Sequence, residues 1–209
     1  VDEIVFLDDV QFDKRSWQQR NRVKTSNGEL ILTVPVISKN LFNQKINEVK
    51  IDHSTKFQKK MIRSISQNYS RTKYYKDYST ELFSILNFNY KNLIDLNLDL
   101  ILFICKKIGI NYKFSLSSEL NIKSSKTELI QDICLAKKAT TYVSTIGAND
   151  YLNDKNFEKI DVKLKFFNFS DKAYDQQYGQ FLKNLSVIDL LFNVGPQAKN
   201  ILKNYLLIK

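Results

Sequence analysis

The stretch TELIQDICLAKKATTYVST (127–145) places a helical segment directly before a strand-like run. Residues 127–138 are typical of a helix and TYVST (141–145) of a strand, and further strand-like runs, YKFSL (112–116) and VKLKFFNF (162–169), lie on either side. Strands that alternate with helices indicate crossover units, which bring the strands into a mostly parallel sheet. The sequence therefore predicts an α/β fold with a mostly parallel sheet flanked by helices.

The first quarter of the chain is rich in strand patterns. RVKT (22–25) and ELILTVPVI (29–37) flank a turn at residues 26–28, which indicates a hairpin. Before them, the apolar head of IVFLDDVQF (4–12) is typical of a further strand. Residues 1–52 should thus form a strand-rich N-terminal layer.

Residues 54–108 have helical patterns instead. The apolar side chains of Phe57, Met61, Ile65 and Tyr69 recur every four residues, as one face of a helix requires. We therefore expect a helical insertion near 54–108, within a single domain that spans residues 1–209.

The predicted sheet also predicts where a ligand would bind. We expect residues 4–7, 141–144 and 162–166 to be strands of one sheet. In open α/β sheets, ligands lie outside the carboxyl ends of the strands. The residues that follow IVFL (4–7) and TYVS (141–144) are therefore the favoured positions for a functional site.

The composition is that of a globular chain of 209 residues. Five Gly and two Pro are too few for a fibrous or low-complexity protein, and the chain contains no apolar run of about 18 residues that could span a bilayer as a helix. We predict a cytoplasmic protein without a transmembrane segment.

The net charge of +10 raises the question of a nucleic-acid partner. Of the 32 basic residues 27 are Lys, and these are spread along the whole chain rather than gathered into one stripe. Dispersed lysines mainly confer solubility. We therefore expect no nucleic acid as a partner, while a non-catalytic nucleic-acid-binding or assembly protein remains an alternative interpretation of the charge.

The arginines are more informative than the lysines because three of only five fall within eight residues. These are Arg15, Arg20 and Arg22, beside the single tryptophan, Trp17. A guanidinium group can hold a phosphate or carboxylate in two parallel hydrogen bonds, which an ammonium group cannot do. We predict that all four residues bind substrate; the alternative is a solvated loop in which the arginines pair with nearby aspartates.

Acidic side chains follow both favoured strands. Asp8 and Asp9 come directly after the first strand, and Asp150 and Tyr151 belong to the loop after the second. A carboxylate at such a position can act as a base or anchor a cation. We predict catalytic roles for Asp8, Asp9 and Asp150 and a substrate-binding role for Tyr151.

Asp189 stands out for a different reason, because it interrupts the apolar run LSVIDLLFN (185–193). A carboxylate in such a helix must be hydrogen-bonded or face a cleft. We predict that it contributes to substrate binding. The following Gly195 and Pro196 predict the end of this helix.

No metal site is expected. The chain has one histidine, His53, and two cysteines, Cys105 and Cys134, without a CxxC pair. Four-ligand zinc sites and disulfide frameworks need more of these residues. Each cysteine lies in an apolar helical stretch, where we expect a reduced, mostly buried thiol.

Several blocks of this sequence together resemble the WbqC-like protein family, which is encoded among bacterial surface-polysaccharide genes. The blocks are FLDDVQF (6–12), KRSWQQRNR (14–22), LTVPV (32–36), ICKKIGI (104–110), SSEL (117–120), YVSTIGANDYL (142–152) and QYGQFLKNLSVIDLLFNVGP (177–196). The family usually begins with a His/Gln-Pro-x-x-x-Pro segment. This sequence starts at Val1, after that point, so we expect an N-terminal strand and loop to be missing.

The resemblance implies a sugar-modifying transferase of O-antigen or capsule biosynthesis, which moves an acyl or aminoacyl group to an activated amino-sugar. It also implies a small-molecule activated sugar as partner and a phosphorylated or nucleotide-linked donor. VFLDDVQF (5–12) before a basic segment is similar to the strand and loop of nucleotidyltransferases. An ATP-using enzyme of nucleotidyltransferase-like architecture is therefore the alternative, by fold analogy alone.

Overall fold

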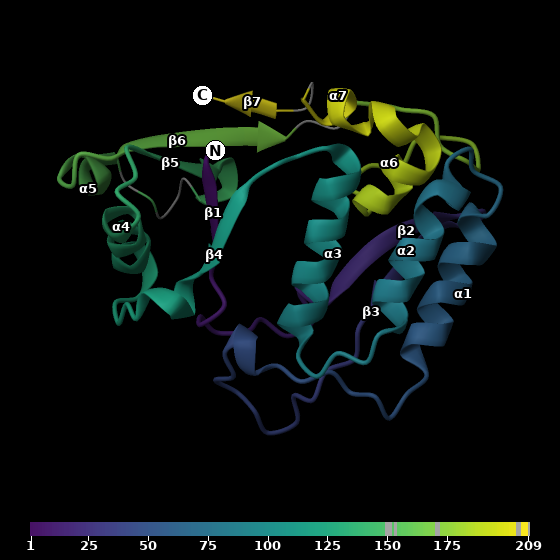
Figure 1. Ribbon diagram of the computed structural model, residues 1–209, viewed down its shortest axis with the longest axis horizontal. Coiled ribbons are helices and arrows are strands. Elements are labelled where there is room, and N and C mark those ends of the chain that lie inside the picture. Colours follow the sequence, from purple (N-terminus) through teal and green to yellow (C-terminus); the bar gives the residue numbers. More distant parts are fainter. Residues whose placement is uncertain (149–151, 153, 170–171, 204–205, 209) are drawn as a thin grey trace. The chain divides into compact units, whose positions relative to one another are not determined.

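A computed structural model of the chain describes residues 1–148, 152, 154–169, 172–203 and 206–208. The backbone contacts divide the chain into two compact units that are interleaved along the sequence. Unit 1 comprises residues 1–8, 112–170 and 202–209, and unit 2 comprises residues 9–111 and 171–201. Figure 1 shows the elements of both units in sequence colours.

Unit 1 contains two small sheets. In one, β1 (Glu3–Phe6) pairs in parallel with β4 (Lys113–Leu116). In the other, β6 (Lys163–Phe169) lies between β5 (Thr141–Thr145), to which it is parallel, and the antiparallel β7 (Leu206–Ile208). The helices of this unit are η2 (Ser117–Leu120), α4 (Lys126–Ala136), η3 (Ile146–Ala148) and α5 (Asp154–Glu158).

Unit 2 joins a strand hairpin to a group of helices. β2 (Arg20–Thr25) pairs antiparallel with β3 (Gly28–Thr33) around the predicted turn. α1 (Phe57–Tyr69), α2 (Tyr75–Asn87) and α3 (Leu93–Ile108) follow in sequence and lie side by side (Figure 1). The remaining helices are η1 (Ile46–Glu48), α6 (Val187–Val194), η4 (Gly195–Gln197) and α7 (Ala198–Lys203), of which the last two residues belong to unit 1.

The α/β class is confirmed, with short parallel sheets, flanking helices, a strand-rich beginning and a helical insertion at the predicted place. The face of α1 is also as predicted, because Phe57, Met61, Ile65 and Tyr69 are its buried residues. The prediction of one sheet is wrong for the first strand. β5 and β6 share a sheet, but β1 pairs with β4 in a separate one. The alternation of strands and helices predicts parallel pairing without specifying which strands are neighbours.

The core of unit 1 contains one of the two cysteines. Cys134 packs in α4 with Ala148, Leu152, Phe157 and Val162 and is 4% exposed. Cys105 in α3 is only half-buried, whereas the sequence predicts a mostly buried thiol for both cysteines. Among the described residues, no helix is both long and apolar enough to cross a membrane.

Replacing Cys134 by Ala should lower the free energy of unfolding by about 1 kcal/mol or somewhat more, since it truncates a packed side chain. Burial also raises the pKa of the Cys134 thiol, which disfavours the reactive thiolate. Urea unfolding of Cys134→Ala measures the first effect, with Cys105→Ala as the matched control of smaller effect. Labelling of Cys134 in the folded protein at the rate of a free thiol would contradict its burial.

Candidate functional site

Asp8 lies at the end of β1, as the sequence predicts, but its carboxylate is used within unit 1. The residue is 3% exposed. Its Oδ1 accepts hydrogen bonds from the backbone N–H of Ser118 at 2.9 Å and from the Ser117 hydroxyl at 3.2 Å, and its Oδ2 accepts one from the Ser118 hydroxyl at 2.7 Å. Asp8 thus fastens the end of β1 to the start of η2. Asp9, the next residue, is half-buried at the beginning of unit 2.

Two of the three clustered arginines lie together on β2. Arg20 and Arg22 are separated by one residue, and side chains two apart on a strand project from the same face. The guanidinium carbon of Arg22 lies 4.8 Å from the centre of the Trp17 ring, and its Nη1 donates to Glu29 Oε2 at 3.0 Å. Trp17 stays 63% exposed. Arg22, Trp17 and Arg20 therefore form a basic and aromatic patch on unit 2, here called the arginine face.

The arginine face has unused hydrogen-bonding capacity. The Nε atoms of Arg20 and Arg22 are buried and have no hydrogen-bond partner among the described residues. A buried donor without a partner is costly. The ion pair of Arg22 is made with Glu29 rather than with an aspartate that the sequence suggested. Arg15 is exposed and has a left-handed backbone with φ of 63°.

Asp189 proves to be hydrogen-bonded inside unit 2. It is fully buried, and its Oδ1 and Oδ2 accept hydrogen bonds from the Tyr69 and Tyr174 hydroxyls, each at 2.7 Å. The Tyr69 hydroxyl also accepts the backbone N–H of Lys24 at 2.8 Å. Burial raises the pKa of Asp189, although both tyrosine hydrogen bonds oppose that shift. These four residues form a continuous network, here called the Asp189 network, and the substrate-binding role of Asp189 stays a prediction.

Lys24 is a residue of this network that sequence reasoning missed. Only 1% of it is exposed, and its Nζ donates to Gln176 Oε1 at 3.1 Å and to Gln180 O at 2.6 Å. Burial lowers the pKa of Lys24, and the negative charge of Asp189 opposes this shift. The sequence could have included Lys24, because side chains two apart on a strand project from the same face. In RNRVKT (20–25), Lys24 therefore shares the face of Arg20 and Arg22.

The structure brings together two of the blocks that resemble the WbqC-like family, residues 14–22 and 177–196. The backbone N–H of Ser186, directly before α6, donates to Arg22 O at 2.8 Å. Lys24, two residues further along β2, is held by Gln176 and Gln180. The segment 176–189 therefore supports the strand that carries the arginine face. Asp150 and Tyr151 lie outside the described residues.

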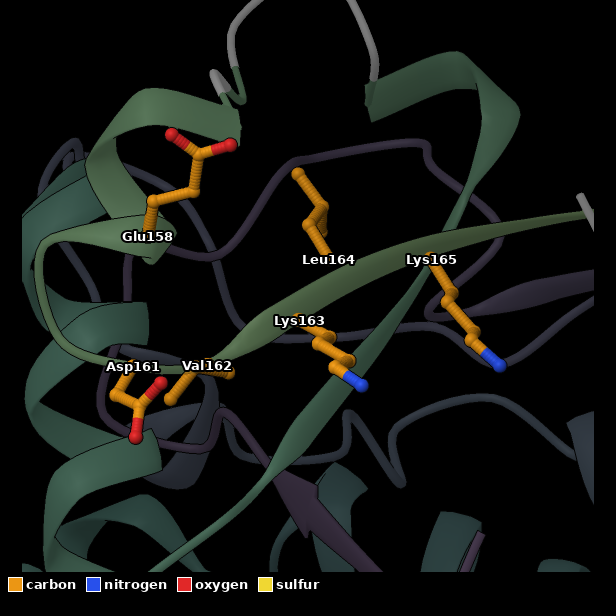
Figure 2. Close-up of a pocket in the computed structure, with 6 residues that line it drawn as sticks. All are labelled: Glu158, Asp161, Val162, Lys163, Leu164 and Lys165. Atoms are coloured by element: carbon orange, nitrogen blue, oxygen red, sulfur yellow. The ribbon is translucent and has the colours of Figure 1, made fainter.

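A surface hollow in unit 1 lacks the geometry of a binding site. It is lined by Glu158, Asp161 and residues 162–165 and has a volume of about 540 Å³. Figure 2 shows that Lys163 and Lys165 project to one side of β6 and Leu164 to the other. The charged groups do not converge on one point. Among the described residues, no group of three or more His, Cys, Asp or Glu is placed to hold a metal ion.

Fold and site together define an α/β protein with a basic and aromatic patch formed by a strand hairpin and the segment before it. The chain belongs to the WbqC-like protein family, whose model matches residues 1–201. It is 36% identical to the uncharacterized protein Rv1507c of Mycobacterium tuberculosis over 205 residues, which are 97% of this chain and 88% of that protein. No solved structure matches the chain.

Proposed function

We propose that this chain is a cytoplasmic transferase that moves an acyl or aminoacyl group to an activated amino-sugar in bacterial surface-polysaccharide biosynthesis. The arginine face carries the proposal. Two guanidinium groups on one hairpin and the exposed indole of the segment before it suit a ligand that combines phosphate with a planar ring, as a nucleotide-linked donor does. Membership of the WbqC-like family supports the same class of substrate.

Each member of the arginine face has a distinct role in this proposal. Arg20 binds the phosphate, because no ion pair with a described residue competes for it. Arg22 is kept in place by Glu29 and by the Trp17 ring. Trp17 stacks on the base or sugar ring with its exposed surface. Asp9 and Asp150 remain candidates for the general base, while Asp8 orients the end of β1.

Replacing Arg20 by Lys should weaken binding of a nucleotide-sugar by about tenfold to a hundredfold, since the charge stays but the bidentate hydrogen bonds are lost. Calorimetric titration with uridine diphosphate N-acetylglucosamine measures this effect. Arg63→Lys is the matched control, because Arg63 is an exposed arginine that belongs to α1 and not to the hairpin. ATP in a parallel titration tests the nucleotidyltransferase-like alternative.

Equal affinities of the wild type and Arg20→Lys would remove Arg20 from the site. No binding of any phosphorylated donor would reject the arginine face as a donor site altogether. Mass spectrometry of surface polysaccharide from cells with and without the gene tests the pathway. An unchanged glycan would count against a role in polysaccharide modification.

A further inference from the structure

Unit 2 contains a polar cavity that the proposed function does not use. It has a volume of about 650 Å³, within the range of small-molecule sites. Its walls come from the C-terminal end of α1 and the turn after it, from the segment before α6, and from α6 itself. The lining residues are Gln67, Asn68, Ser70, Arg71, Thr72, Gln177, Tyr178 and Asn193.

Every residue that lines this cavity is polar. Four are amides and three carry hydroxyls, so the lining offers both hydrogen-bond donors and acceptors. Gln177 Oε1 is buried and has no hydrogen-bond partner among the described residues. A polyhydroxylated ligand offers both donors and acceptors and would satisfy such a lining. A purely apolar ligand would leave it unsatisfied.

Hydrogen bonds hold the wall of the cavity in place. Asn68 O accepts hydrogen bonds from the Tyr178 hydroxyl at 3.1 Å and from Gln177 Nε2 at 3.4 Å. Asn193 Nδ2 donates to Asp189 O at 2.8 Å, which ties this wall to the Asp189 network. Tyr178 has a φ of 62°, a left-handed conformation that costs free energy in a residue other than glycine. Such strain is often concentrated at ligand sites.

Arg71 supplies the charge of the cavity. It is exposed and makes no ion pair or hydrogen bond with the described part of the chain, so its guanidinium group is available to an anion. We infer that this cavity binds a phosphorylated sugar, with the amides and hydroxyls contacting the sugar hydroxyls and Arg71 contacting the phosphate. This site is separate from the arginine face, and the inference does not rest on the proposed transferase activity.

Calorimetric titration of the full chain with glucosamine 6-phosphate, glucosamine and inorganic phosphate tests the inference. The phosphorylated sugar should bind more tightly than either of its parts. Arg71→Ala should weaken its binding by about tenfold or more, because a charge-assisted contact is lost. The control is Arg63→Ala, which removes an exposed arginine of α1 that does not line the cavity. It should leave the affinity unchanged.

Gln177→Met tests the sugar part separately, since it keeps the length of the side chain but removes the amide with its unpaired Oε1. It should weaken binding of glucosamine 6-phosphate and leave that of inorganic phosphate unchanged. Any of three results would overturn the inference. These are equal affinities for inorganic phosphate and the phosphorylated sugar, equal losses of affinity in the Arg71 and Arg63 variants, or no saturable binding. Arg20→Lys should not affect glucosamine 6-phosphate, so failure of this site is distinguishable from failure of the proposed function.

Discussion

Replacing Gly195 by Ala should lower the free energy of unfolding by about 3 kcal/mol or more. Gly195 ends α6 with φ of 56° and ψ of −125°, a conformation that residues with a Cβ rarely adopt. A Cβ at this position would lie 2.5 Å from the Cδ1 and Cγ atoms of Tyr74. The Tyr74 backbone N–H is fixed by a 3.0 Å hydrogen bond to Phe192 O. Backbone strain and a steric clash therefore act together, and urea unfolding measures their sum.

Two other glycines separate these contributions. Gly28 has a φ of 106°, but no atom lies within 4 Å of the position that a Cβ would occupy, so Gly28→Ala should cost only the backbone strain, about 1–2 kcal/mol. Gly147 has no positive φ, and no atom lies within 4 Å of the position that a Cβ would occupy. The free energy of unfolding of Gly147→Ala should therefore stay within about 0.5 kcal/mol of the wild type. If Gly195→Ala cost no more than Gly28→Ala, the contact with Tyr74 would not restrict this position.

The end of α6 also shows how far local sequence signals reach. Gly195 and Pro196 predicted that the helix stops there, and it ends at Val194. The hairpin turn and the buried face of α1 were predicted in the same way, because turn residues and periodicity act within a few positions. The contact with Tyr74 was not predictable, since it joins segments far apart in the chain. The separate pairing of β1 with β4 was missed for the same reason.

In the candidate site, too, features that depend on neighbours in sequence were predictable and features that depend on distant contacts were not. The arginine cluster was visible because its members are neighbours in sequence, and two of them share one face of β2. Lys24 was missed because a lysine is normally solvated, and its burial depends on distant acceptors, Gln176 and Gln180. Tyr69 was recognised only as part of an apolar helix face. Its hydroxyl bond to Asp189 depends on how α1 and α6 pack.

Replacing Asp189 by Ala should lower the free energy of unfolding by about 3 kcal/mol or more, because it removes the acceptor of two hydrogen bonds and each buried donor left without a partner costs about 1–3 kcal/mol. The change leaves the buried Tyr69 hydroxyl and the partly buried Tyr174 hydroxyl without their acceptor. It also removes the negative charge that favours the protonated form of buried Lys24. Urea unfolding at neutral pH measures the loss. A change below about 1 kcal/mol would show that the network relaxes without Asp189.

Asp189→Asn is the matched variant, and it should cost much less than Asp189→Ala, because the amide keeps an acceptor for Tyr69 and has a similar volume.

The shifted pKa of Asp189 also predicts a pH dependence of stability. Burial raises the pKa of Asp189 in the folded protein above its unfolded value of about 3.9, so folding favours the protonated carboxyl. The stabilisation from this group is therefore present below the unfolded pKa and is lost as the pH rises through the folded pKa. The asparagine variant lacks this titration. The free energy of unfolding of the wild type, relative to Asp189→Asn, should thus fall as the pH rises from the acid range to neutrality. Urea unfolding of both proteins over that range gives the difference directly, and a difference that stays constant or grows with pH would show that the network stabilises the charged carboxylate instead.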